Sequence, residues 1–172
     1  MWILRETENM NSADKTPKSI SMEAIIFDID GTLSDATHRR HLVENGNNQW
    51  DAFFKAIPDD PPIVPIVDLA RSLIRFGEKA ILFATGRPER TRKDTLVWLT
   101  GHGLEIDFQS RLFMRNDDDK RPDHIVKRDI LDQMREAGFV PILVFDDRQS
   151  VVDMWRREGI RVAQTAPGNL LP

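Results

Sequence analysis

The chain has 172 residues, a length that suits one domain with a sizeable hydrophobic core. Hydrophobic residues make up 40% of it and charged residues 30%, and no apolar run approaches the roughly 20 residues of a membrane-spanning helix. The net charge of -4 disfavours a protein that wraps long nucleic acid, although the end of a nucleic acid, where few phosphates are contacted, is still a possible substrate. The absence of cysteine excludes disulfides and thiolate metal sites and, with no visible secretory signal, favours a cytoplasmic location.

The beginning of the chain predicts a tail, a buried strand and an insertion. Residues 1–21 are polar with little periodicity, so we expect a flexible N-terminal tail followed by one domain over residues 22–172. The apolar run 24–27 is typical of a buried strand in a parallel sheet. The next stretch, 33–62, is much longer than the usual connection of about 2–6 residues. We therefore expect it to form a small cap or lid with one or two short helices.

Aromatic residues stand out within this insertion, on one of the expected short helices. Phe53 and Phe54 are interpreted as packing residues. Trp50 has two interpretations, a core anchor or a platform on which a substrate lies, and the sequence does not decide between them.

Strands alternate with helices through the rest of the chain, and Gly or Pro marks several helix ends. The expected helices are 63–76, 88–100, 122–137 and 150–158, and the expected strands are 79–84, 112–114, 140–145 and 160–163. This alternation predicts an α/β fold with a doubly wound parallel sheet and right-handed crossovers. The chain has no Gly-x-x-x-x-Gly-Lys-Ser/Thr loop, so it contains no P-loop kinase domain.

Polar side chains follow three of the expected strands. Asp28 and Asp30 come after the first strand, Thr85 after the second, and Asp146 and Asp147 after the fourth. Ligands of a parallel sheet bind beyond the carboxyl ends of its strands, which is where these side chains are expected. Simpler interpretations exist, because the first pair suits an Asx turn and the last pair suits the N-terminal cap of a helix.

These motifs, together with Lys127 on the helix 122–137, resemble those of the haloacid dehalogenase (HAD) superfamily of phosphohydrolases and follow the same order. The resemblance implies a HAD-like Rossmannoid fold. It also implies that Asp28 is the nucleophile that forms an aspartyl-phosphate and that Asp30 is the general acid and base. Thr85 and Lys127 would contact the phosphate. Lys120 is a competing candidate for the lysine, but it lies in a loop rather than on a helix.

The same resemblance implies a magnesium ion. Asp28 and Asp146 would bind Mg²⁺, together with a backbone carbonyl from Asp30. Asp147 would be a direct or water-bridged ligand.

One branch of the superfamily is more similar than the others, namely the 3′-phosphatase domain of bacteriophage polynucleotide kinase-phosphatase. The similarity extends over residues 24–166 and includes Arg39 after the first motif, Arg87 at the end of the second, and Asp123 one helical turn before the motif lysine. It implies that Arg39, Thr85, Gly86, Arg87 and Asp123 bind the substrate. The kinase half of such proteins is missing from this chain.

The implied activity is a Mg²⁺-dependent phosphomonoesterase that removes a 3′-phosphate from polynucleotide ends during nucleic-acid repair. One alternative is a 5′-(deoxy)nucleotidase that acts on free nucleoside monophosphates. Another is a non-catalytic protein that binds nucleic-acid ends or serves as the partner subunit of a kinase. The expected substrate is thus a nucleic-acid 3′ end or a nucleotide, and a separately encoded kinase or ligase is a possible partner.

Overall fold

The computed structural model describes residues 21–107 and 111–167, so nearly all of the expected tail 1–21 lies outside the described residues. A five-stranded parallel sheet forms the centre of the domain, in the order β3-β2-β1-β4-β5. Its strands are β1 Met22–Phe27, β2 Ala80–Pro88, β3 Leu112–Arg115, β4 Phe139–Asp146 and β5 Arg161–Gln164. The predicted doubly wound α/β fold is confirmed.

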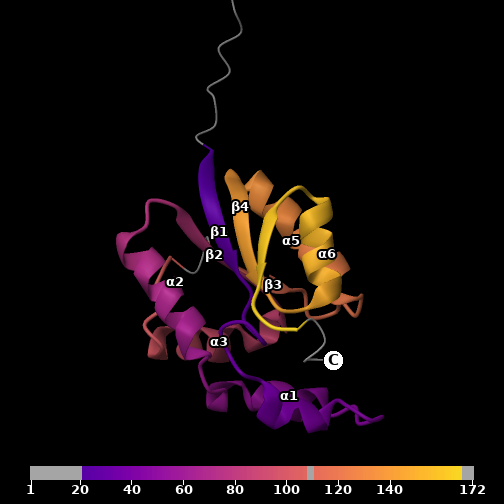
Figure 1. Ribbon diagram of the computed structural model, residues 1–172. Helices are drawn as coiled ribbons and strands as arrows, with labels where there is room; N and C mark the ends of the chain where they lie inside the picture. Colours follow the sequence, from indigo (N-terminus) through magenta and orange to yellow (C-terminus); the bar gives the residue numbers. More distant parts are fainter. Residues whose placement is uncertain (1–20, 108–110, 168–172) are drawn as a thin grey trace, which may run out of the picture.

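Helices cover both faces of the sheet (Figure 1). Helices α2 (Val64–Phe76) and α3 (Arg92–Gly101) pack on one face, and α5 (Asp123–Glu136) and α6 (Gln149–Arg157) pack on the other. No helix of the described residues has both the length and the apolar character needed to cross a membrane.

The central strand β1 supplies both layers of the core. Successive side chains of a strand point to opposite faces, so the residues of β1 alternate between the two layers of the core. Ala24 and Ile26 pack with residues of α5 and α6, whereas Ile25 and Phe27 pack with residues of α2 and α3. This alternation decides on which side of the sheet the polar residues beyond the strand ends lie.

The insertion 33–62 lies beyond the carboxyl ends of the strands (Figure 1). It contains one short α-helix, α1 (Trp50–Lys55), and two 3₁₀ helices, η1 (Thr37–Leu42) and η2 (Ile57–Asp59). An isolated bridge between Ser34 and Pro62 joins the two ends of the insertion. The insertion therefore stands as a small helical cap on the edge of the sheet where the predicted site lies.

One predicted boundary is wrong. The helix expected from residue 88 begins instead at Arg92, after the 3₁₀ turn η3 (Glu89–Thr91). Pro88 pairs with Arg115 of β3 after a register shift, and its backbone is extended. The second strand therefore continues past Thr85, and Arg87 lies within this extension at the carboxyl end of β2.

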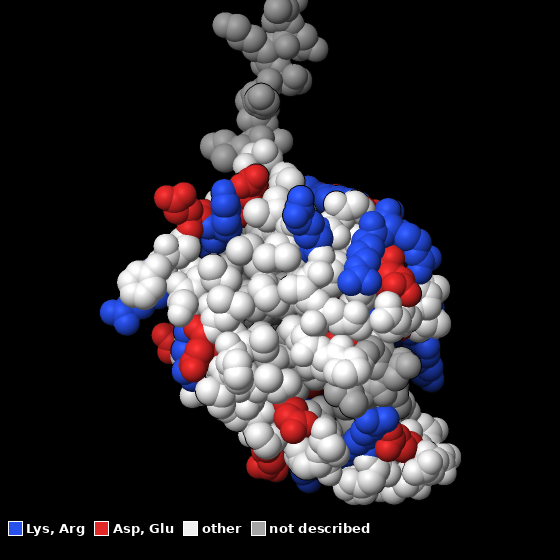
Figure 2. Space-filling model, in the orientation of Figure 1, with Lys and Arg blue, Asp and Glu red and all other residues white. Residues whose placement is uncertain are grey.

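Charged side chains are mixed in sign on the face shown in Figure 2, where they lie mostly near the margin around an uncharged centre. This distribution agrees with the small negative net charge of the chain. It gives no support to binding of long nucleic acid across this face.

Candidate active site

Most of the predicted site residues line one cleft at the carboxyl ends of β1, β2 and β4, and the other three, Arg39, Thr85 and Asp146, are buried beside it. The cleft has a volume of about 580 Å³ and is lined by Asp28, Asp30, Arg87, Lys127 and Asp147, among others. Helix α1 of the cap and the loop 116–121 contribute further parts of its wall. A space of this size admits a small organic molecule or a nucleotide.

A buried lysine bridges two of the carboxylates. Strand alternation turns Asp28 and Asp146 toward the side of the sheet covered by α5, and Lys127 extends toward them from that helix. Its Nζ donates hydrogen bonds to Oδ1 of Asp28 at 2.6 Å and to Oδ2 of Asp146 at 2.9 Å. Lys127 is only 2% exposed. Burial alone would lower its pKa, but Asp146, Asp28 and Asp123 raise the pKa above its ordinary value and keep the ammonium charged.

Three carboxylates form a compact cluster beside this lysine. Oxygens of Asp28, Asp146 and Asp147 all lie within 4.8 Å of one another, and the three residues are buried. Burial raises the pKa of Asp28 well above its usual range, and the neighbouring carboxylates add to the effect. Burial and Asp146 likewise raise the pKa of Asp147 to about 6. One ammonium does not balance three carboxylates, so this all-oxygen cluster suits a hard divalent cation.

Two glycines allow acidic residues to come close to the backbone. A Cβ atom on Gly31, whose φ is +88°, would lie 2.4 Å from Oδ2 of Asp147. A Cβ atom on Gly86 would lie 2.4 Å from Oδ1 of Asp123. A side chain at either position would therefore displace the neighbouring carboxylate, and at Gly31 it would also strain the backbone.

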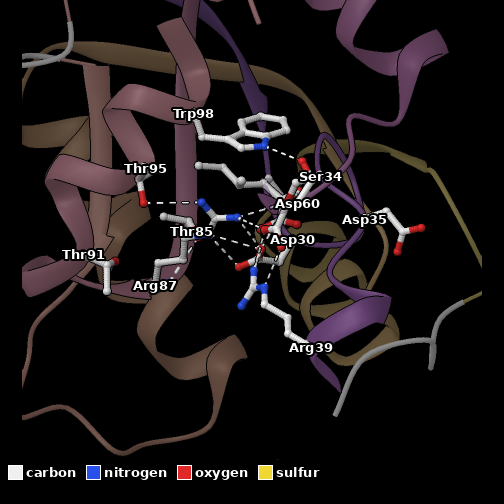
Figure 3. A network of polar contacts seen from close by, with 12 residues as sticks. Asp30, Ser34, Asp35, Arg39, Asp60, Thr85, Arg87, Thr91, Thr95 and Trp98 are labelled. Atoms are coloured by element: carbon white, nitrogen blue, oxygen red, sulfur yellow. Dashed lines mark hydrogen bonds and ion pairs between the residues drawn. The ribbon is translucent and has the colours of Figure 1, made fainter. Parts of the chain in front are cut away.

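The second half of the site is a cluster of arginines and acids (Figure 3), which contacts Thr95 and Trp98 of α3 on the other face of the sheet. The Nη2 atoms of Arg39 and Arg87 both donate to Oδ1 of Asp30 at 2.6 Å. Burial alone would raise the pKa of Asp30, but Arg87 and then Arg39 outweigh it and hold the pKa far below its usual range. In this arrangement Asp30 is ionised, which is the opposite of what the predicted general acid needs at the start of a reaction.

Asp60 holds both arginines and was not among the predicted site residues. It lies at the end of the cap, and its carboxylate accepts hydrogen bonds from Nε of Arg39 at 2.7 Å and from Nη2 of Arg87 at 2.9 Å. Its backbone carbonyl accepts a bond from Nε1 of Trp98 at 2.8 Å (Figure 3). The sequence gives only a weak signal, an acidic pair before Pro61 and Pro62, which resembles an ordinary turn.

The remaining predicted residues occupy distinct places around the cleft. Thr85 is fully buried, and its Oγ1 accepts a hydrogen bond from the backbone N–H of Arg87 at 3.2 Å. Asp123 accepts a bond from Nη2 of Arg115 at 3.0 Å and lies 3.8 Å from Nζ of Lys127. Lys120, the competing lysine, is exposed on the wall of the cleft and makes no contact with the carboxylate cluster.

A tryptophan supports the carboxylate cluster from the core. Trp155 on α6 is fully buried, and its Nε1 donates to Oδ2 of Asp146 at 3.2 Å. The indole packs within the hydrophobic layer beneath α5 and α6. It thereby restricts the orientation of Asp146, a role that apolar periodicity alone does not reveal.

The fold and the cluster of carboxylates and buried lysine at the strand ends define a phosphatase domain of the haloacid dehalogenase type. The chain belongs to the family described as the polynucleotide kinase PNKP phosphatase domain, whose model matches residues 22–170. The predicted family is therefore confirmed.

Known relatives agree with this assignment. A putative bifunctional polynucleotide kinase/RNA ligase of Autographa californica nuclear polyhedrosis virus is 27% identical over 144 residues, which are 83% of this chain and 18% of that protein. A chain in the structure of the Pnkp1/Rnl/Hen1 RNA repair complex is 26% identical with a TM-score of 0.70, and the match covers 95% of this chain and 48% of that one. The present chain thus spans less than half the length of either relative.

The class C acid phosphatase of Bacillus anthracis has a similar fold. It is 18% identical with a TM-score of 0.57, over 76% of this chain and 53% of that chain.

Proposed function

We propose that this domain is a Mg²⁺-dependent phosphomonoesterase that removes the 3′-phosphate from polynucleotide ends through an aspartyl-phosphate on Asp28. The observation that carries the proposal is the placement of Asp28. It directly follows the central strand, 2.6 Å from the buried Lys127 ammonium, in a cleft that is also lined by the buried Arg87 and by Asp30, which the buried Arg39 contacts. Membership of the PNKP phosphatase-domain family supports the choice of a polynucleotide end as substrate.

In the first step a carboxylate oxygen of Asp28 attacks the phosphorus atom. The bond between phosphorus and the sugar oxygen breaks, and Asp30 gives that oxygen a proton. In the second step Asp30 takes a proton from water, whose oxygen attacks the phosphorus atom of the aspartyl-phosphate. Inorganic phosphate leaves and the Asp28 carboxylate is restored, so protons and charge balance over the cycle.

The arginine cluster explains how Asp30 acquires its proton. Without substrate, Arg39 and Arg87 compensate the charge of Asp30. A phosphate in the cleft offers further anionic oxygens to the same two guanidiniums, and the planar guanidinium fork suits such oxygens. Sharing the arginines with phosphate raises the pKa of Asp30, so that it can hold the proton that it then gives to the leaving oxygen.

The residues present fit a magnesium ion. Asp28, Asp146 and Asp147 would hold it, with the backbone carbonyl of Asp30, and Lys127 balances the remaining negative charge. When bound, Mg²⁺ neutralises phosphoryl oxygens and lowers the repulsion that an anionic nucleophile meets. Thr85 and Lys127 contribute further donors toward the phosphate.

The test compares phosphate release from a 3′-phosphorylated oligonucleotide with release from free nucleoside 5′-monophosphates. We expect a higher kcat/KM on the oligonucleotide, and we expect the Asp28→Asn variant to be inactive on both. A strong preference for free 5′-monophosphates would contradict the proposal and indicate a 5′-nucleotidase.

We further propose that the domain acts beside a kinase or a ligase. The viral relative is named for both activities, and the structural relative belongs to an RNA repair complex. Co-purification of the tagged domain with a kinase or ligase from its own source tests this proposal, and a domain that purifies alone in repeated trials would contradict it.

A further inference from the structure

Helix α1 presents an aromatic surface to the cleft. Trp50 and Phe54 both line the cleft, and Trp50 is 42% exposed. Their rings stack at a centroid distance of 5.9 Å with an interplanar angle of 28°. Phe53 lies beneath them, 8% exposed, and meets both rings edge-on. The sequence alone did not decide whether Trp50 is a core anchor or a platform for a substrate. The structure places it at the surface of the cleft, packed against the other aromatic rings of α1.

This surface is continuous with the phosphate end of the site. The guanidinium of Arg39 lies over the ring of Phe53, with Cζ 4.1 Å from the ring centroid, and the same guanidinium contacts Asp30. On the other side, Cζ of Arg90 lies 5.4 Å from the ring centroid of Phe54. Asp28 and Arg87 line the same cleft as Trp50 and Phe54, so a ligand whose phosphate lies at Asp28 has these aromatic rings on the wall of the space that holds the rest of the ligand.

An exposed lysine lies farther along the same cleft. Lys120 belongs to the loop 116–121 and lines the cleft. Neighbouring cations of this wall, Arg115 and Arg121, are paired with carboxylates or backbone carbonyls. Lys120 has no ion-pair partner among the residues that the structure describes, so its charge is available to an anion that enters the cleft.

We infer that Trp50 and Phe54 form a stacking subsite for the base of the terminal nucleotide and that Lys120 meets the phosphodiester that precedes it. The inference rests on the proposed function and specifies its substrate as a single-stranded polynucleotide 3′ end. Aromatic rings stack on every base, so this subsite tolerates any sequence, and a lone cation suits a backbone phosphate. A free mononucleotide uses only the aromatic part, and a duplex end must unpair its last nucleotide to reach it.

The test uses three 3′-phosphorylated substrates: an oligonucleotide, the same oligonucleotide with an abasic terminal residue, and a nucleoside 3′-monophosphate. We expect Trp50→Ala to lower kcat/KM on the base-bearing oligonucleotide by about 5- to 150-fold, the worth of one stacked base. The loss on the abasic oligonucleotide should be much smaller, so the base-to-abasic ratio of the wild type should collapse toward one. Trp50→Phe should keep most of that ratio.

Lys120→Ala should lower kcat/KM on the oligonucleotide far more than on the nucleoside 3′-monophosphate. It should also reduce the slope of log(kcat/KM) against log salt by about 0.7, the contribution of one contact to a single strand. Matched controls are Phe76→Ala and Lys93→Ala, which remove an exposed aromatic and an exposed lysine outside the cleft. Both should match the wild type on all three substrates.

The subsite is refuted if the wild type works well on the oligonucleotide but Trp50→Ala lowers kcat/KM equally on base-bearing and abasic ends. An unchanged salt slope in Lys120→Ala would refute the assignment of the lysine. A wild type that hydrolyses other phosphate esters but not 3′-phosphorylated oligonucleotides would instead refute the proposed function itself. The two failures are thus distinguished by the wild-type rate alone.

Discussion

Replacing Asp60 with Asn tests whether the arginine cluster depends on this residue. The side chains of Asp60, Arg39 and Arg87 are all fully buried, so the two guanidiniums rely on protein carboxylates for compensation. Asp60→Asn keeps the shape of the side chain but leaves Asp30 as the only carboxylate that contacts both arginines, among the described residues. The substitution therefore leaves two buried guanidiniums with one carboxylate fewer to compensate their charge, and it creates no cavity.

The size of the effect follows from this burial. Removing one partner from a buried ion-pair network costs about 3–5 kcal/mol, and we expect the lower end because Asp30 remains. For a domain of this length, each 1 kcal/mol lowers Tm by about 2–4 °C, so Tm should fall by roughly 6–12 °C. The kcat/KM should fall as well, because neither arginine keeps its position toward the phosphate.

Thermal and urea unfolding of the variant and the wild type measure the loss. Asp59→Asn is the matched control, since it makes the same chemical change at the adjacent, exposed residue of η2. It should differ from the wild type by no more than about 0.5 kcal/mol. If Asp60→Asn is as stable as Asp59→Asn, the arginines do not need Asp60 and the reasoning from buried charge is wrong.

Four further predictions, one of which covers two arginine variants, have defined outcomes. Asp28→Asn should abolish phosphate release while circular dichroism shows an intact fold, because an amide cannot form the acyl-phosphate. Arg39→Lys and Arg87→Lys should each lower kcat/KM on an oligonucleotide 3′-phosphate at least about tenfold, because lysine keeps the charge but lacks the fork; normal rates in both would contradict their contact with phosphate. Added Mg²⁺ should raise Tm of the wild type and not of Asp146→Asn, as measured by calorimetry. Trp155→Phe should weaken Mg²⁺ binding about 10- to 100-fold in a titration, because Asp146 loses the donor that orients it.

The sequence was sufficient to place the strands of the sheet and the first half of the site, which is the carboxylate cluster with its lysine. Apolar runs followed by carboxylates locate β1 and β4, and strand alternation then turns Asp28 and Asp146 toward the same helix. Lys127 is identified because it lies on the inner face of a periodic helix, whereas Lys120 lies in a loop. Local patterns determine all of these placements.

The second half of the site was only partly predictable. Arg39 and Arg87 were expected near the substrate, but their joint contact with Asp60 depends on how the cap folds back over the sheet. That path is fixed by long-range contacts such as the bond from Trp98 to the Asp60 carbonyl, which no local pattern encodes. The helix start expected at residue 88 was wrong for a similar reason, because pairing of Pro88 with β3 outweighs its preference for a first helical turn.

The most direct test of the proposed activity uses one oligonucleotide sequence that carries a single phosphate, at its 3′ end or at its 5′ end. Wild-type domain with Mg²⁺ should release phosphate from the 3′-phosphorylated strand with a much higher kcat/KM than from the 5′-phosphorylated strand. Equal rates on the two strands, or faster release from the 5′ end, would contradict a polynucleotide 3′-phosphatase.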